Sequence, residues 1–149
     1  MTTRNLGAYR LTGRRDRGAT GIAHVAIDTN LDEQVELIEL PGLGSTDSNT
    51  WRAFQGVMQR LSSLESEAVA APIDFSRRSE DGAWYVTGMP IGLSLRDLRE
   101  RLGRLHWRQA CMILHELTKA LSYTHSRGVA HGNLHPGALM VDVTGAVQL

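Results

Sequence analysis

The sequence predicts an α+β fold, in which antiparallel strands and one packed helix precede a mainly helical second half. Three observations support this prediction. Short strand-like stretches alternate with turns before residue 41. Apolar residues recur at helical spacing over residues 50–64. A longer helical pattern covers residues 107–126 and contains no internal Gly or Pro.

The predicted strands are separated by polar or glycine-containing turns. They cover residues 8–12, 22–27, 34–40, 73–75 and 84–87. The basic, glycine-containing stretch 14–21 is predicted to be a turn after the first of them. Asp28-Thr29-Asn30 begins the turn of a hairpin between the second and third strands. The first half therefore reads as an antiparallel sheet with one amphipathic helix.

The second half is expected to be helical up to a small terminal hairpin. Ser94, with Asp97 three residues later, is typical of a helix start, and Gly103 ends that helix. The apolar face predicted for the long helix 107–126 comprises Trp107, Ala110, Leu114, Leu117, Leu121 and Thr124. Cys111 on its flank is expected to be a small core residue. Residues 139–142 and 146–149 flank a Thr-Gly turn and form the hairpin.

Composition excludes several classes of function. The 149 residues carry 16 basic and 16 acidic side chains, so no global field attracts nucleic acid or an acidic membrane. One cysteine cannot form an internal disulfide, which favours the reducing cytoplasm. No apolar run reaches the roughly 20 residues that span a bilayer. His131 and His135 lie four residues apart, but Gly132 and Pro136 disfavour a helical metal site there, so no metal is expected. Lys119 is the only lysine.

Three segments resemble a known family. The stretch RDRGATGIAHVAID (15–28) is similar to a degraded glycine-rich loop, with Gly18 and Gly21 at its second and third glycines. YVTGMPIGLSL (85–95) resembles a hinge with the start of the next helix. LSYTHSRGVAHGNLHPGALMVDVTGAVQL (121–149) resembles the catalytic-loop region of bacterial serine/threonine kinases. The resemblance covers about residues 9–149 and implies a protein-kinase-like N-lobe (1–90) followed by a truncated helical C-lobe (91–149), ending before the DFG segment.

The resemblance also implies which side chains stand at the chemical positions. Ile38 stands at the phosphate-binding lysine and Val57 at its glutamate partner, so an apolar Ile38–Val57 contact is expected in place of the ion pair. Glu36 replaces a small residue that packs on adenine. In the loop, Asn133, His135 and Ala138 replace the catalytic aspartate, the loop lysine and the magnesium-binding asparagine.

From these positions the sequence predicts a pseudokinase, not an enzyme, that serves as a protein-binding scaffold or regulatory subunit. A protein partner or a second copy is expected on the long helix, with Met112, Ile113, Leu117 and Leu121 as the candidate contacts. No cofactor is expected, and nucleotide binding is expected to be weak or absent, with Gly18, Gly21, Thr87 and Met89 as vestiges of a site.

Two other functions stay open. The first is a nucleotide- or ligand-sensing kinase-like domain, since the hinge Thr87-Gly88-Met89 offers backbone hydrogen bonds to a purine. The second is an unorthodox phosphotransferase that uses His135 or an aspartate as its base.

Overall fold

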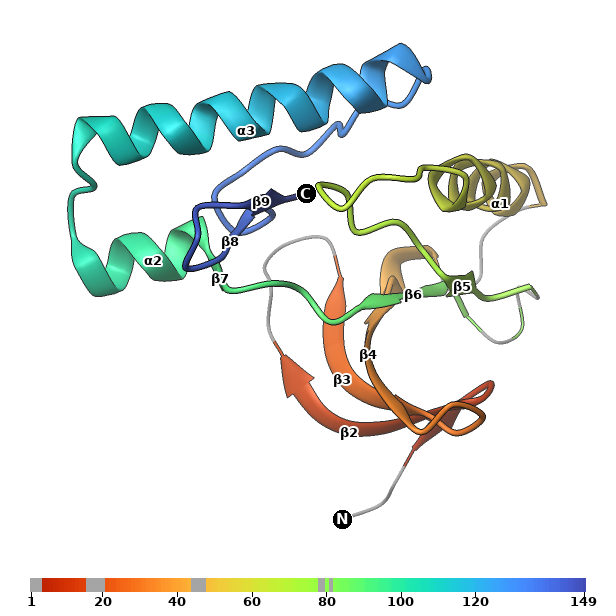
Figure 1. Cartoon of the computed structure of the whole chain (residues 1–149). Helices are drawn as coiled ribbons and strands as arrows, with labels where there is room; N and C mark the ends of the chain where they lie inside the picture. The colour runs from red at the N-terminus through yellow and green to blue at the C-terminus, as the bar shows by residue number, and fades with distance from the viewer. Residues whose placement is uncertain (1–3, 16–20, 44–47, 78–79, 81) are drawn as a thin grey trace. The chain divides into compact units, whose positions relative to one another are not determined.

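The computed structural model describes residues 4–15, 21–43, 48–77, 80 and 82–149. The chain forms two compact units (Figure 1). Unit 1 comprises residues 1–63 and 71–89, and unit 2 comprises residues 64–70 and 90–149. The predicted α+β class, with an antiparallel sheet and one helix before a small helical portion, is confirmed.

Unit 1 is built on a curled antiparallel sheet of six strands in the order β1-β2-β3-β4-β6-β5 (Figure 1). The strands are β1 (Asn5–Leu6), β2 (Tyr9–Arg15), β3 (Ile22–Asp28), β4 (Glu33–Glu39), β5 (Asp74–Phe75) and β6 (Trp84–Gly88). Alternation along β4 sends Val35 and Leu37 into an apolar cluster with Tyr9, Trp84 and Val86. The opposite side of β4 carries Glu36 and Ile38, which are also buried.

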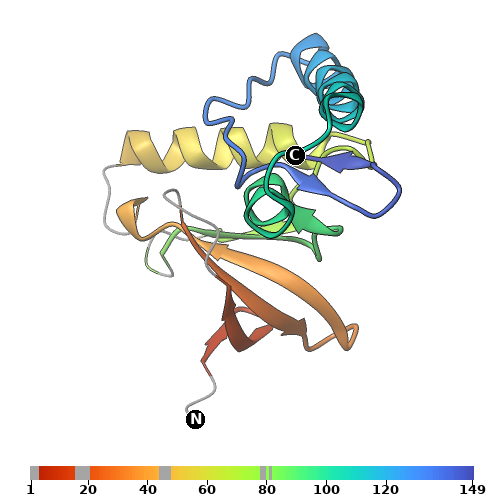
Figure 2. The ribbon, with the colours of Figure 1, turned by 90° about the vertical axis from the view of Figure 1, so that its left-hand side faces the viewer.

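Helix α1 (Ser48–Ser62) follows the short 3-10 turn η1 (Pro41–Leu43) and packs on unit 1 through its apolar face (Figure 2). Phe54 and Met58 are its buried residues, and they cluster with Phe75 and Ala83. The Phe54 and Phe75 rings meet edge to face with centroids 6.4 Å apart. The helix predicted from apolar spacing is therefore present, and it packs as an amphipathic helix should.

The predicted turn at residues 14–21 begins too early. Arg14 and Arg15 belong to β2, where they pair with His24 and Ala23 of β3. Backbone pairing with β3 extends β2 to Arg15. The side chains of Arg14 and Arg15 are at most half-buried, so a strand can carry these two charged residues without burying them fully. Gly18 and the rest of residues 16–20 lie outside the described residues.

Unit 2 combines two helices with a three-stranded sheet in the order β7-β8-β9 (Figure 1). Its elements are β7 (Leu93–Ser94), α2 (Leu95–Leu102), α3 (Trp107–Ser126), β8 (Met140–Val141) and β9 (Val147–Gln148). The predicted cap is present, because the Ser94 hydroxyl accepts a hydrogen bond from the Asp97 N–H at 3.1 Å. The terminal hairpin is also confirmed, as the β8–β9 pair.

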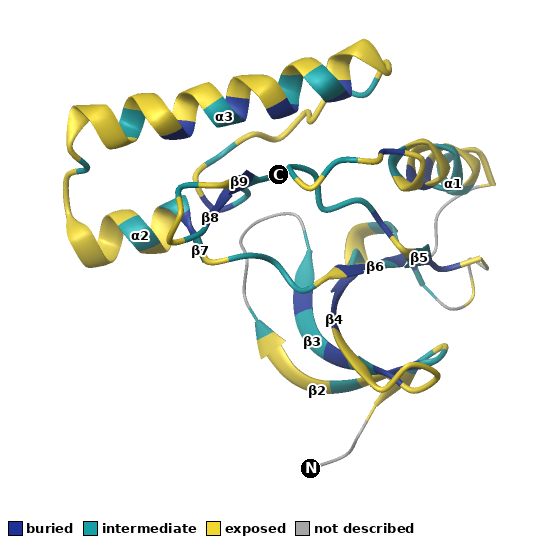
Figure 3. Ribbon diagram, in the orientation of Figure 1, coloured by how far each residue is buried: buried dark blue, intermediate teal, exposed yellow. Residues whose placement is uncertain are grey.

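Helix α3 presents to the core a face that matches the predicted one only in part, because Leu117 and Thr124 are buried as predicted but other members of that face are not. Its buried residues are Ile113, Leu117, Ala120 and Thr124, and Ile113 and Leu117 cluster with Leu139, Val141 and Val147. Figure 3 shows this buried stripe on one side of α3 and exposed residues along the rest. Trp107 and Leu114, placed on the core face by the sequence prediction, are exposed, and so is Cys111.

Burial in unit 2 disagrees with the partner-facing prediction for two of its four residues on α3. Ile113 and Leu117 are buried in the core of unit 2, and Leu121 packs against the same cluster. Only Met112 is exposed. Apolar residues lie on more than one side of this helix. The side that becomes buried is the one that packs against the β7–β9 sheet, which the helical pattern alone does not reveal.

Candidate functional site

The first part of the candidate site is the sheet face of unit 1 that carries Glu36 and Ile38. Strand register places Glu36 between Val25 and Thr87, and Ile38 between Ala23 and Tyr85. Directly opposed residues of an antiparallel pair point to the same face, so these side chains form one layer.

Glu36 is the unusual member of this layer, because its carboxylate is buried with 0% exposure. Burying a charge is unfavourable unless an opposite charge or hydrogen bonds compensate for it. The Arg15 guanidinium supplies one such charge, with Nη1 4.0 Å from the Glu36 Oε1. The sequence placed Arg15 in a turn, whereas the structure places it in β2 with its guanidinium near Glu36.

Gly21, just before β3, lies against the Ile38 side chain. A Cβ added at Gly21 would be 2.9 Å from the Ile38 Cγ2 and 2.7 Å from the Glu39 carbonyl oxygen. Such distances are too short for a real side chain, so glycine is required for the close approach of β3 and β4. This packing role accounts for Gly21 without any ligand.

Val57 does not form the predicted buried pair with Ile38. Its side chain is 40% exposed on α1, while Phe54 and Met58 of that helix face the core. The helical pattern fixed which residues belong to α1, but the neighbouring strands decide which of them become buried.

The hinge positions lie at the end of β6. Thr87 is buried, and its hydroxyl donates to the Gly88 carbonyl oxygen at 3.1 Å. Gly88 is exposed, and Met89 is half-buried.

The second part of the candidate site is the loop 131–138 of unit 2. The His131 Nδ1 accepts the Asn133 N–H at 3.3 Å, and the His135 Nδ1 accepts the Gly137 N–H at 3.1 Å. The Ala138 N–H also donates to the His135 carbonyl oxygen at 2.9 Å, which closes a turn. Asn133 is exposed, whereas His135 and Ala138 are half-buried.

One imidazole of this loop, that of His131, has a shifted pKa. Desolvation lowers the pKa of His131 below its usual value, and the positive charge available to His135 lowers it further. His131 therefore favours its neutral form near neutral pH, which keeps its ring nitrogen available as the acceptor for Asn133.

Arg96 of α2 is a neighbour of this loop. Its Nη2 lies 2.8 Å from the place where a Cβ of Gly137 would stand. The absence of a side chain at residue 137 thus leaves room for the guanidinium beside the loop. In the sequence, a glycine that follows a proline in a loop indicates a turn but does not identify this neighbour.

The loop does not fit a magnesium ion at the position that the resemblance implies. Ala138 offers a methyl group there, whereas Mg²⁺ needs oxygen ligands. Across the described parts of the chain, no three His, Cys, Asp or Glu side chains gather closely enough to hold a metal.

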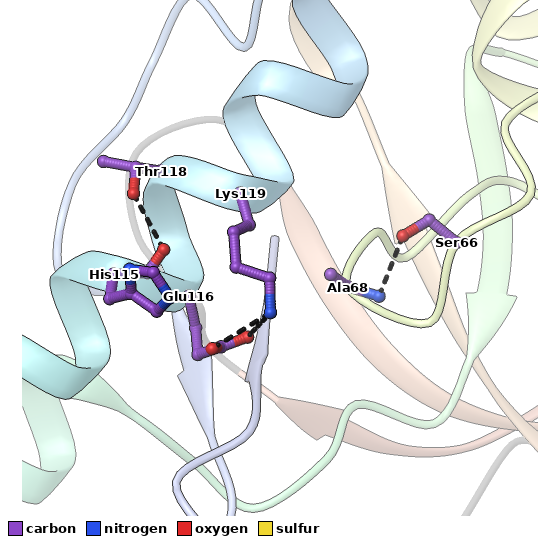
Figure 4. Close-up of polar contacts among 6 residues, drawn as sticks. All are labelled: Ser66, Ala68, His115, Glu116, Thr118 and Lys119. Carbon is purple, nitrogen blue, oxygen red and sulfur yellow. Dashed lines mark hydrogen bonds and ion pairs between the residues drawn. The ribbon is translucent and has the colours of Figure 1, made fainter.

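The only lysine is engaged away from the loop. Lys119 lies on α3, and its Nζ donates to both carboxylate oxygens of Glu116 at 3.1 and 3.0 Å (Figure 4). In the part of the chain that the structure covers, no helix has the length and apolar character to cross a membrane.

Comparisons with known proteins identify relatives but no matching family model. The chain is 26% identical over 147 residues to the serine/threonine-protein kinase PknA of Mycobacterium tuberculosis, covering 96% of this chain and 34% of PknA. It is 26% identical over 147 residues to PrkC of Bacillus subtilis, covering 94% of this chain and 22% of PrkC. It is 27% identical over 146 residues to PknA of Corynebacterium glutamicum, covering 95% of this chain and 31% of that relative. The chain thus spans about a third or less of the length of each.

These relatives overturn the prediction that the chain is not an enzyme. Proteins similar to 94–96% of the chain are named as serine/threonine-protein kinases. Differences from a motif at Ile38, Val57, Asn133, His135 and Ala138 are facts of the sequence, but they are not evidence of inactivity.

Proposed function

The chain is related to the bacterial serine/threonine protein kinases, and we propose that it acts in protein phosphorylation as a kinase-like domain with a protein-binding, regulatory role. The relatives that match most of the chain support the kinase-like part of this proposal. The exposed surface of α3 supports the protein-binding part.

The observation that carries the binding role is an apolar stripe on α3 made of Trp107, Cys111 and Leu114. These residues are spaced four and three apart, so they lie along one side of the helix. Trp107 is 64% exposed and Leu114 is 57% exposed. Covering one such side chain completely is worth about 1.5–3 kcal/mol, so a partner that covers the stripe gains affinity.

Site-specific photocrosslinking tests this role. A benzophenone amino acid replaces Leu114 in the host cell, and the control carries it at Gln59, an exposed position on α1. We expect a discrete crosslinked protein at position 114 that is missing at position 59. Equal patterns at the two positions, or no product at position 114, would contradict the proposal.

Light scattering distinguishes a second copy of the chain from another protein. If the stripe joins two copies, the purified chain is a dimer at micromolar concentration, and Leu114→Glu returns it to the monomer. If another protein covers the stripe, the chain is monomeric and the crosslinked product has the mass of that protein plus one copy.

Nucleotide binding with phosphotransfer is the second candidate function, and the names of the relatives favour it. A ligand at 100 times its dissociation constant adds about 2.7 kcal/mol of stability, so ATP should raise the midpoint of thermal unfolding. Phosphotransfer is measured as the transfer of labelled phosphate from ATP to the chain itself or to a general kinase substrate.

We propose that Ile38 and His135 occupy the two lysine positions of the kinase sequence motifs, and that Val57, Asn133 and Ala138 occupy the positions of the glutamate, the aspartate and the asparagine. Ile38→Lys tests the first assignment, because Glu36 lies on the same face two residues away and could pair with the new ammonium group. The variant should show a larger thermal shift with ATP than the parent chain. An unchanged shift would argue against Ile38 facing a nucleotide.

A further inference from the structure

A hollow of about 550 Å³ lies where α2 ends and the chain turns toward α3. Arg99, Gly103, Arg104 and Leu105 line it. All four belong to unit 2. None of them was assigned a role in the kinase-like site described above.

The surroundings of this hollow are strongly basic in a chain that is neutral overall. Residues 95–108 contain Arg96, Arg99, Arg101, Arg104 and Arg108 against only Asp97 and Glu100, so their net charge is +3 with His106 neutral. Local charge of one sign in a neutral chain creates a directed field that attracts an oppositely charged ligand.

The two arginines that line the hollow are available for a ligand. Arg99 and Arg104 are exposed. The ion pairs formed among the described residues involve neither of them. A guanidinium presents a planar fork of donors that matches a carboxylate in two parallel hydrogen bonds.

Hydrogen bonds fix the backbone on both sides of the hollow, at the end of α2 and at the start of α3. On the α2 side, the Gly103 N–H donates to the Arg99 carbonyl oxygen at 2.8 Å. On the α3 side, the His106 N–H donates to the Gln109 Oε1 at 3.1 Å, and the His106 Nδ1 accepts the Arg108 N–H at 3.3 Å. These caps fix the ends of both helices, so the two arginines do not depend on a freely moving loop.

The hollow also has apolar surroundings. Leu105 lines it and packs against the core of unit 2. Leu102, just before Gly103, is 62% exposed. A ligand that satisfies the whole site therefore carries both negative charge and an apolar group.

We propose that this hollow, lined by Arg99, Gly103, Arg104 and Leu105, is a docking site for an acidic peptide segment of a protein partner. Two carboxylates of the segment pair with Arg99 and Arg104, and an apolar side chain between them packs on Leu105. A nucleic acid fits less well, because the residues that line the hollow include no aromatic ring for base stacking, whereas Leu105 offers an apolar contact to a peptide side chain. The proposal stands independently of the stripe on α3.

Fluorescence polarisation with a defined probe tests the site. The probe is a labelled peptide with two glutamates on each side of a leucine, and its matched control has glutamine in place of every glutamate. We expect the glutamate peptide to bind and the glutamine peptide to bind at least about tenfold more weakly, a difference of about 1.4 kcal/mol. Raising the salt from about 50 mM to about 500 mM should weaken the glutamate peptide, since exposed charges are screened.

Charge reversal assigns the binding to this hollow. Arg99→Glu with Arg104→Glu should weaken the glutamate peptide by about tenfold or more, because like charges then face each other. The control Arg52→Glu with Arg60→Glu, on exposed positions of α1, changes the net charge by the same amount and should leave binding unchanged. Circular dichroism confirms that both variants are folded.

Four results would overturn the proposal. The first is no binding of the glutamate peptide up to about 1 mM at low salt. The second is equal binding of the glutamine peptide. The third is an equal loss in the α1 control, which would reduce the effect to overall charge. The fourth is a single-stranded oligonucleotide that binds as tightly as the peptide, which would make the hollow a general polyanion site. The crosslinking experiment at position 114 on α3 is independent of these measurements, so a negative result there leaves the docking proposal unchanged.

Discussion

At the scale of the residue, Gly92 is a position where two backbone segments of unit 2 approach each other closely. Its φ is +54°, and a Cβ added there would be 2.6 Å from the Asp142 Cα and closer still to the Val141 carbonyl oxygen. We predict that Gly92→Ala lowers the free energy of unfolding by about 3 kcal/mol, from backbone strain and the displacement of β8. Urea unfolding measures the loss.

Gly128→Ala is the matched control for this prediction. Gly128 also has a positive φ, of +70°, but a Cβ there would meet no atom within 4 Å. Its substitution should therefore lower the free energy of unfolding by only about 1 kcal/mol. Equal losses in the two variants would show that conformation alone, and not the approach of β8, requires glycine at residue 92.

Asp142 makes the stability of the terminal hairpin depend on pH. Its Oδ1 accepts hydrogen bonds from the Thr144 hydroxyl at 2.7 Å and from the N–H groups of Thr144 and Ala146. These hydrogen bonds hold the pKa of the Asp142 carboxyl below its ordinary value of 3.8, and the bond from the Thr144 hydroxyl has the largest effect. A depressed pKa stabilises the folded state above the unfolded pKa, and this stabilisation is lost as the pH falls through the folded value.

Asp142→Asn removes the charge but keeps the shape. We predict that the variant unfolds at a lower temperature than the parent at about pH 7, and that the difference shrinks as the pH falls below about 4. Thermal unfolding at both pH values measures it. A difference that stays constant over this range would mean that the carboxylate charge contributes nothing to the turn.

Residue-level prediction worked best where a motif fixed the spacing. Ile38 was assigned to the lysine position of the motif with an apolar contact to Val57, and its side chain is buried. Val57 was matched by the same reasoning, but it is exposed because a helix position specifies a face only after its neighbours are known. The neighbours of Arg15 and Arg96 were not predicted, because they are distant in the sequence.

At the scale of the element, most helices and strands were predictable within a few residues. The long helix was predicted at residues 107–126 and is observed as Trp107–Ser126, because no Gly or Pro interrupts its apolar pattern. The very short strands β1 and β7 were not predicted. Two residues carry too little pattern to reveal a strand, and pairing with a neighbour creates it.

Helix α3 also holds a segment that lies far from it in the chain. The Tyr123 hydroxyl accepts the Glu65 N–H and donates to the Glu65 carbonyl oxygen, both at 2.8 Å. The same segment continues beside the C-terminal residue, since Leu149 exchanges backbone hydrogen bonds with Ala68 and Ala70. These bonds explain why residues 64–70 belong to unit 2 although the chain on either side belongs to unit 1.

Tyr123→Phe tests this attachment. We predict a loss of about 1 kcal/mol in the free energy of unfolding, and faster hydrogen exchange at the Glu65 amide, because both bonds of the hydroxyl disappear. The ring stays, so its contact with the Arg127 guanidinium at 3.9 Å is kept. Ser122→Ala, an exposed change one residue away, should alter neither quantity. Unchanged exchange at Glu65 in Tyr123→Phe would refute the attachment.

At the scale of the whole molecule, the residues of the predicted catalytic constellation are divided between the two units. Ile38, Val57 and Thr87 belong to unit 1, whereas Asn133, His135 and Ala138 belong to unit 2. The sequence could assign them to positions of one motif because motif spacing follows the chain. The docking hollow could not be found in this way, since Arg99 and Arg104 form a site only when the turn at Gly103 places them around a common space.

The charge balance of the whole chain leads to the last prediction. Basic and acidic side chains number 16 each, so repulsion between molecules is weakest near the pI of about 7.0. We predict a solubility minimum near pH 7 in polyethylene glycol precipitation. At lower pH the net charge becomes positive, so repulsion between molecules grows and solubility should rise. Arg99→Glu with Arg104→Glu lowers the net charge by four, so its minimum should move to lower pH. The α1 control pair should move it equally, because net charge sets solubility whereas only the hollow should bind the acidic peptide. A minimum that stays near pH 7 in both variants would show that apolar surface, such as the stripe on α3, governs association of the molecules.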